Sequence, residues 1–161
     1  MFWEFLRPFF EWSYNTSIGE QIRDSLWAFA ILEVFHLIGL TVVLGAIGIF
    51  GLRLLDLTMR DLPLSKVARE TAPWAAAGFG LMLLSGVPMY MSEAIKCFNS
   101  GPFRIKMVFL CIGIVLIGTL YRKVTGPTEA RIDRRIARIA GGLVLTLWLG
   151  VAIAGRAIGF F

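Results

Sequence analysis

The chain has little charge, one histidine and only two cysteines, and each scarcity excludes a class of protein. Charged residues make up 17% of its 161 residues and hydrophobic ones 57%, a balance that argues against a soluble domain. Cys97 and Cys111 stand 14 positions apart, and Cys111 falls inside an apolar run, which excludes a secreted disulfide scaffold. Abundant Leu, Ile, Val and Phe exclude intrinsic disorder. A mean hydropathy of +0.74 indicates a membrane protein instead.

Four apolar runs reach or approach the roughly 20 residues that a membrane-spanning helix needs. They predict an all-α integral membrane protein, a four-transmembrane-helix bundle that forms a single domain over residues 1–161. The expected spans are about residues 26–55, 73–91, 103–121 and 139–160.

Local signals refine the first two spans. Ser17, with Glu20 three residues later, predicts a capping box from which one long helix would run over residues 18–56. Pro73 is expected in the first turn of the second span, where its missing N–H is harmless, and Pro88 is expected to kink the end of that span.

Lysine and arginine are divided unequally between the two ends of the spans. Ten of the sixteen belong to the loops after the first and third spans, and cytoplasmic loops are the ones enriched in these residues. Both termini are therefore expected on the side away from the cytoplasm. The ten are Arg53, Arg60, Lys66, Arg69, Arg122, Lys123, Arg131, Arg134, Arg135 and Arg138. Nucleic acid is excluded as a partner, because these basic segments are short and adjoin the membrane.

Aromatic residues are concentrated at the start of the chain. Seven of the 21 fall within the first 14 residues: Phe2, Trp3, Phe5, Phe9, Phe10, Trp12 and Tyr14. Because aromatic rings favour the headgroup level of a bilayer, residues 1–17 are expected to form an interfacial segment on the outer leaflet.

Glu33 and His36 are the polar residues that the first span does not explain. Ionisable groups at the centre of a spanning helix cost roughly 2.5 to 3.5 kcal/mol on insertion scales. The two residues are three positions apart, so they share one helix face, and Gly39 continues that stripe. His36 is the only histidine and is expected roughly 15 Å deep in the bilayer.

Three functions are compatible with this stripe. In the first, His36 is the axial ligand of a haem b, Glu33 is the catalytic group that relays protons, and Gly39 leaves space for the flat porphyrin. In the second, Glu33 and His36 belong to the polar pathway of a small oligomeric channel or transporter. In the third, the pair only holds together a structural membrane subunit without a ligand.

Arg104 and Lys106 favour an anionic ligand. They occupy the first turn of the third span, where the helix dipole disfavours cations, on the side where positive charge is not expected. Haem propionates or a quinone-like anionic partner would neutralise them. Small residues on three spans favour close helix packing and a homo-oligomer: Gly45, Gly48, Gly51, Ala76, Gly80, Gly86, Gly150, Ala154, Gly155 and Gly159.

Several short motifs resemble those of a bacterial four-helix integral membrane family of unknown function. They are Ile-Leu-Glu-Val-Phe-His-Leu-Ile-Gly-Leu at residues 31–40, followed by Arg53, Pro73-Trp74, Gly78-Phe79, Ser85-Gly86 and Phe103-Arg104-Ile105-Lys106. In layout the chain is distantly similar to the haem-associated membrane protoporphyrinogen oxidase family and to copper-resistance D membrane domains.

The oxidase resemblance implies functional roles for its first-span histidine and third-span lysine, which correspond here to His36 and Lys106. Further histidines of that family are absent, so its enzymatic activity is not implied. We therefore expect a haem b-binding protein of the bacterial inner membrane with a redox or electron-transfer role. His36 would ligate the iron, and Gly39, Arg104 and Lys106 would contact the cofactor. A redox role leaves open both electron transfer and oxidoreductase catalysis.

Overall fold

The computed structural model describes residues 3–126 and 133–160, where every regular element is a helix. Outside the described residues lie the basic Arg131 and the first two residues of the predicted interfacial segment. The elements are η1 (Glu4–Leu6), α1 (Arg7–Tyr14), α2 (Ser17–Asp24), α3 (Ala28–Leu54), α4 (Leu64–Ser92), α5 (Ala94–Asn99), α6 (Gly101–Thr125), α7 (Arg134–Ala157) and η2 (Ile158–Phe160).

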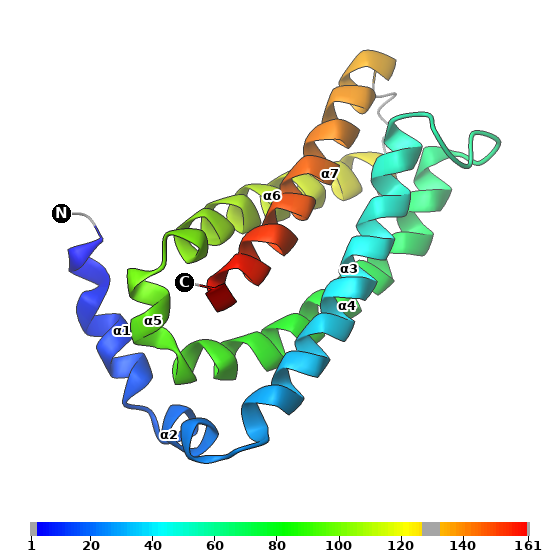
Figure 1. Ribbon diagram of the computed structural model, residues 1–161. Helices are drawn as coiled ribbons and strands as arrows, with labels where there is room; N and C mark the ends of the chain where they lie inside the picture. Colours follow the sequence, from blue (N-terminus) through cyan, green and yellow to red (C-terminus); the bar gives the residue numbers. More distant parts are fainter. Residues whose placement is uncertain (1–2, 127–132, 161) are drawn as a thin grey trace.

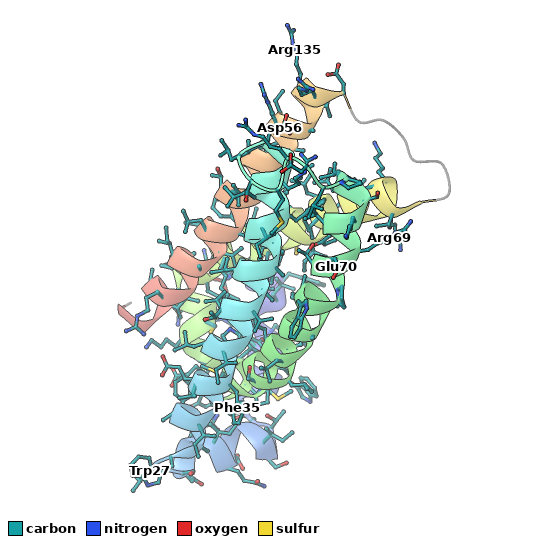
Figure 2. The ribbon with its side chains drawn as sticks, turned by 90° about the vertical axis from the view of Figure 1, so that its right-hand side faces the viewer. Trp27, Phe35, Asp56, Arg69, Glu70 and Arg135 are labelled. Carbon is teal, nitrogen blue, oxygen red and sulfur yellow. The ribbon has the colours of Figure 1, made fainter. Side chains whose placement is uncertain are left out.

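The prediction of an all-α protein with four spans is confirmed. Helices α3, α4, α6 and α7 are each long and apolar enough to cross a membrane. Figure 1 shows α3 beside α4 and α6 beside α7, with α1, α2 and α5 gathered at the end of the bundle opposite the α3–α4 connection. Figure 2 places Asp56 and Arg135 at one end and Trp27 at the other. We call these the Asp56 end and the Trp27 end.

Small residues allow the helices to approach one another closely. A Cβ at Gly39 of α3 would lie 2.9 Å from the carbonyl oxygen of Gly78 in α4, and one at Gly141 of α7 would lie 2.8 Å from that of Gly51. Such distances require backbone-to-backbone contact. Other glycines, Gly45, Gly48 and Gly80, face open space, so the predicted homo-oligomer remains a prediction.

The predicted long helix over residues 18–56 is wrong. It is divided into α2 and α3 by an extended Ser25. The hydroxyl of Ser25 accepts a hydrogen bond from the Ala28 backbone N–H at 3.2 Å, which satisfies a free donor at the start of α3. The cap of α2 is Thr16, whose hydroxyl accepts from the Gly19 N–H at 3.3 Å, rather than Ser17.

Helices α4 and α7 begin earlier than predicted. Helix α4 starts at Leu64, so Pro73 lies in its interior and not in its first turn, and the helix continues through Pro88 to Ser92. Figure 1 shows α4 bent along its length. Both helices have polar first turns that project beyond the apolar run, and a hydropathy pattern does not include such turns.

The N-terminal segment packs against the protein along one face. Phe10 is buried among the rings of Trp3, Tyr90, Phe98 and Phe103, at centroid distances of 5.3 to 6.2 Å. The opposite face of the segment is exposed and carries Phe5, Phe9 and Trp12. Some aromatic residues of the segment therefore form an internal cluster, and the others form an exposed face that can contact lipid headgroups. For the exposed face, an interfacial position stays a prediction.

Candidate functional site

The orientation of His36 is fixed by a serine on the neighbouring helix. The imidazole Nδ1 lies 3.2 Å from the Ser85 Oγ of α4, and Ser85 donates its hydroxyl proton to the Leu81 carbonyl at 2.7 Å. With that proton on the Leu81 carbonyl, the Ser85 oxygen is available to accept from His36 in the tautomer that carries its hydrogen on Nδ1. In that tautomer the lone pair of the ring is on Nε2, the arrangement expected of a histidine that binds a metal through Nε2.

A glycine makes room for the imidazole. A Cβ at Gly86 would lie 2.8 Å from His36 Cε1 and 3.1 Å from Nδ1, so any larger residue would displace the ring. Ser85 orients the imidazole ring, and Gly86 leaves the space that the ring occupies. We call this Ser85-Gly86 pair the seat of His36. The sequence motif contained both residues, but only the packing of α3 on α4 shows that they face His36.

Gly39 does not provide the porphyrin space that the sequence suggested. A Cβ there would lie 2.9 Å from the Gly78 carbonyl oxygen and 2.9 Å from Met82 Cγ. Helix α4 therefore fills that face of α3. Gly39 serves the contact between the two helices, and a ligand at His36 would have to approach from another side of the ring.

Glu33 is paired with a residue that sequence reasoning did not select. Its Oε1 lies 3.6 Å from Arg156 Nη1 of α7, with side-chain exposures of 42% and 72%. His36, on the same face of α3, contacts Ser85 instead. The ion pair links α3 to α7 near the Trp27 end. The sequence did contain a signal that could have identified Arg156, because it is the one basic residue late in the fourth apolar run.

The structure separates Arg104 from Lys106. Two positions on an α-helix differ by about 200°, so the two side chains leave α6 in nearly opposite directions. Lys106 extends toward α7, where its Nζ lies 3.5 Å from the position of a Cβ on Gly155. The Arg104 guanidinium donates to the Phe98 carbonyl at 3.0 Å and stacks 4.8 Å from the centre of the Trp3 ring. Arg104 therefore anchors the N-terminal segment, and of the two only Lys106 points into the bundle.

Five polar residues from four helices consequently meet in the half of the bundle toward the Trp27 end. Glu33, His36, Ser85, Lys106 and Arg156 form this polar cluster. His36 contacts Ser85, Glu33 contacts Arg156, and Lys106 extends to Gly155, the neighbour of Arg156. Besides His36, the cluster holds one carboxylate and two basic side chains. The cluster therefore has a net positive charge and would favour an anionic group.

The cluster is suited to a metal only if most of the ligands come from outside the protein. Among the described residues, no group of three or more His, Cys, Asp or Glu side chains is placed to hold a metal ion. A bare ion would need such a group. A porphyrin supplies four nitrogen ligands itself and requires only an axial side chain, so a single oriented histidine fits haem better than it fits a free metal ion.

The comparison with known proteins identifies a family but no function. Residues 9–161 match the family of unknown function designated DUF6644, so the chain belongs to that family. No curated protein and no solved structure matches the chain.

Proposed function

We propose that this protein is a haem b-binding integral membrane protein with a redox or electron-transfer role, in which His36 is the axial ligand. The observation that supports it best is the seat formed by Ser85 and Gly86, which leaves the Nε2 lone pair of an intramembrane histidine available. The distant resemblance to haem-associated membrane families points to the same residue. When bound, haem iron would supply one-electron chemistry.

The other members of the polar cluster have distinct roles in this proposal. Ser85 holds the imidazole in one tautomer, as outer partners of metal-binding histidines do. The Lys106 ammonium attracts a propionate, and Arg156 provides a second positive charge that Glu33 partly balances. Glu33, 42% exposed, is placed to take up or release a proton at its carboxylate. A lipid-soluble redox molecule such as a quinone is the expected partner, since it would reach the site through the bilayer.

The absorption spectrum of the purified protein tests the proposal. We expect a Soret band, either as isolated or after haem addition, that disappears in His36→Ala. Ser85→Ala should weaken haem binding by about 10- to 100-fold. Ser92→Ala is the matched control, because Ser92 is also a buried α4 serine that donates to its own helix, at 2.8 Å to Met89. Absence of the band under both conditions would exclude haem, and a band that persists in His36→Ala would require another ligand.

The ion pair between Glu33 and Arg156 favours a second candidate, a small oligomeric channel or transporter. The pair joins α3 and α7 within the apolar region, and intramembrane ion pairs often line proton or ion pathways. The expected result is a pH-dependent flux into liposomes that Glu33→Gln abolishes. Flux that is indifferent to this substitution would remove the pathway, and a protein with neither flux nor a Soret band would be a structural subunit.

We also propose that the Asp56 end is cytoplasmic and that both termini lie on the periplasmic side of the inner membrane. Arg53, Lys66, Arg69, Arg134 and Arg138 all lie at this end, in agreement with the enrichment of basic residues in cytoplasmic loops. Alkaline phosphatase fused within the α3–α4 connection should be inactive. Activity there would reverse the orientation.

A further inference from the structure

A pocket at the Asp56 end is separate from the polar cluster. Its volume is about 380 Å³, within the size range of small-molecule sites. Helix α3 contributes Ile49, the α3–α4 connection contributes Leu62, and α4 contributes Val67 and Trp74, so most of the lining is apolar. Lys66 and Glu70 are its charged lining residues. In Figure 2, Glu70 lies on α4 in the half of the bundle that carries Asp56, away from Trp27.

The wall formed by the α3–α4 connection is held in place by a network of hydrogen bonds. Arg53 donates to the Leu62 carbonyl from Nε at 3.2 Å and from Nη2 at 3.0 Å, and its Nη1 lies 2.9 Å from Asp56 Oδ1. Asp56 and Met59 adopt left-handed backbone angles, with φ of 60° and 52°. Such angles are costly for non-glycine residues and persist where surrounding contacts impose them, commonly at binding sites. The pocket is thus formed in advance of any ligand.

The mouth of the pocket carries a cation, and the carboxylate of its lining lies further in. Lys66 precedes Glu70 by one helical turn and is nearer the end of the bundle, and no described residue forms a hydrogen bond or ion pair with its ammonium. Trp74, two turns further along α4, is 66% exposed. A ligand that satisfies both features has an anionic group beside Lys66 and an apolar portion that extends past Val67 toward Trp74.

We propose that this pocket binds an anionic phospholipid, with its phosphate beside Lys66 and an acyl chain along Val67 and Trp74. A soluble anion would gain nothing from the apolar lining, whereas a phospholipid matches both parts. Basic residues next to a spanning helix attract anionic lipids by about 1 kcal/mol each. The proposal does not depend on haem, and it assigns this end of the molecule a specific lipid site in addition to its general positive charge.

Fluorescence of Trp74 provides the test. The protein is placed in nanodiscs that contain phosphatidylglycerol or phosphatidylcholine with brominated acyl chains, and the contribution of Trp74 is obtained by difference from Trp74→Phe. We expect phosphatidylglycerol to quench Trp74 at about fivefold lower mole fraction than phosphatidylcholine, and Lys66→Gln to remove this preference. The matched control is Arg69→Gln, since Arg69 is an exposed cation of the same helix that does not line the pocket; it should keep the preference.

Four results would overturn the proposal. Equal quenching by the two lipids would show that the pocket does not select an anion. Equal loss of preference in Lys66→Gln and Arg69→Gln would reduce the effect to the overall charge of this end. Displacement of the brominated lipid by a neutral short-chain quinone, unaffected by Lys66→Gln, would assign the pocket to a neutral amphiphile. Protection of Trp74 from both lipids only when two copies share a disc would assign the face to a second copy.

Discussion

Apart from the Arg156–Glu33 pair, the arginines that hold elements together at the two ends of the bundle contact different kinds of group. At the Trp27 end, the guanidinium groups of Arg7, Arg23 and Arg104 lie 3.8 to 5.4 Å from the centres of aromatic rings. At the Asp56 end, arginines gather around a carboxylate. Arg53, Arg134 and Arg138 approach Asp56 at 2.9, 3.8 and 3.7 Å.

The difference follows from what each end must hold together. The Trp27 end docks short helices that have abundant aromatic residues, and cations on ring faces add about 0.5 to 2 kcal/mol without a buried carboxylate. The Asp56 end joins the α3–α4 connection to the start of α7 where aromatic residues are few, so one charge links several elements. The first arrangement should be robust to salt and to the loss of any single cation, and the second should depend on Asp56.

The largest expected effect is the loss of the aromatic cluster at the Trp27 end. Phe10→Ala removes a ring that is 6% exposed, and such truncations cost about 3 to 5 kcal/mol. Because the ring joins α1 to α5 and α6, the cost should appear as local detachment of α1. Hydrogen exchange or limited proteolysis of residues 7–14 measures it. Phe9→Ala is the control, since Phe9 is 54% exposed, and an equal effect of both substitutions would show that α1 is held by other contacts.

The thiol of Cys97 reports on the same cluster. Burial, with a further contribution from the Glu93 carboxylate, raises the pKa of Cys97 to about 11 from 9.0. Burial favours the neutral thiol, so the thiolate forms only at higher pH, and at neutral pH its fraction is about 100-fold lower than in an exposed cysteine. In Cys111→Ser protein, maleimide labelling should rise up to about pH 11. A plateau near pH 9, as expected after SDS denaturation, would contradict the burial of Cys97, and Phe10→Ala should move the profile toward that plateau.

Removal of a single charge should weaken the Asp56 end. Asp56→Asn keeps a side chain that tolerates the left-handed backbone (φ 60°) and removes only the carboxylate that Arg53 contacts. The Arg53 side chain is 14% exposed, so the cost should lie between those of surface and buried ion pairs, about 1 to 2 kcal/mol. Thermal unfolding in detergent measures it. Asp61→Asn changes an exposed acid of the same connection, and a similar loss there would show that Asp56 has no special role.

Most of the fold was predictable because a helix needs roughly 20 apolar residues to cross a bilayer, so long apolar runs identify the spans. Four apolar runs gave the four spanning helices, and α3 matches its predicted span to within two residues at each end. The early starts of α4 and α7 were not predictable from hydropathy, because hydropathy measures the apolar core and not the polar turns of the same helix. The break before α3 had a signal that was overlooked, since Ser25 directly precedes the apolar run and caps it.

The candidate site was predictable only in part. Sequence reasoning selected Glu33 and His36 because polar side chains in an apolar helix need an explanation. It selected Lys106, with Arg104, because the first turn of a helix disfavours cations. It could not identify their partners. Ser85 is 49 positions from His36, and Arg156 is more than a hundred from Glu33, so these contacts depend on how the helices pack. Their roles in cofactor binding remain predictions.

Salt provides the smallest effect and the sharpest comparison of the two ends. Arg134 and Arg138 are 80% and 56% exposed, so raising NaCl from about 0.02 M to about 1 M should screen their attraction to Asp56 and cost a few tenths of a kcal/mol. The aromatic cluster buries apolar surface, which screening does not weaken. Hydrogen exchange in one sample should therefore show faster exchange at the start of α7 and unchanged protection in α1. In Asp56→Asn the salt response of α7 should vanish. Loss of protection at both ends, or a response that persists without the Asp56 carboxylate, would mean that salt acts on the whole bundle rather than on that carboxylate.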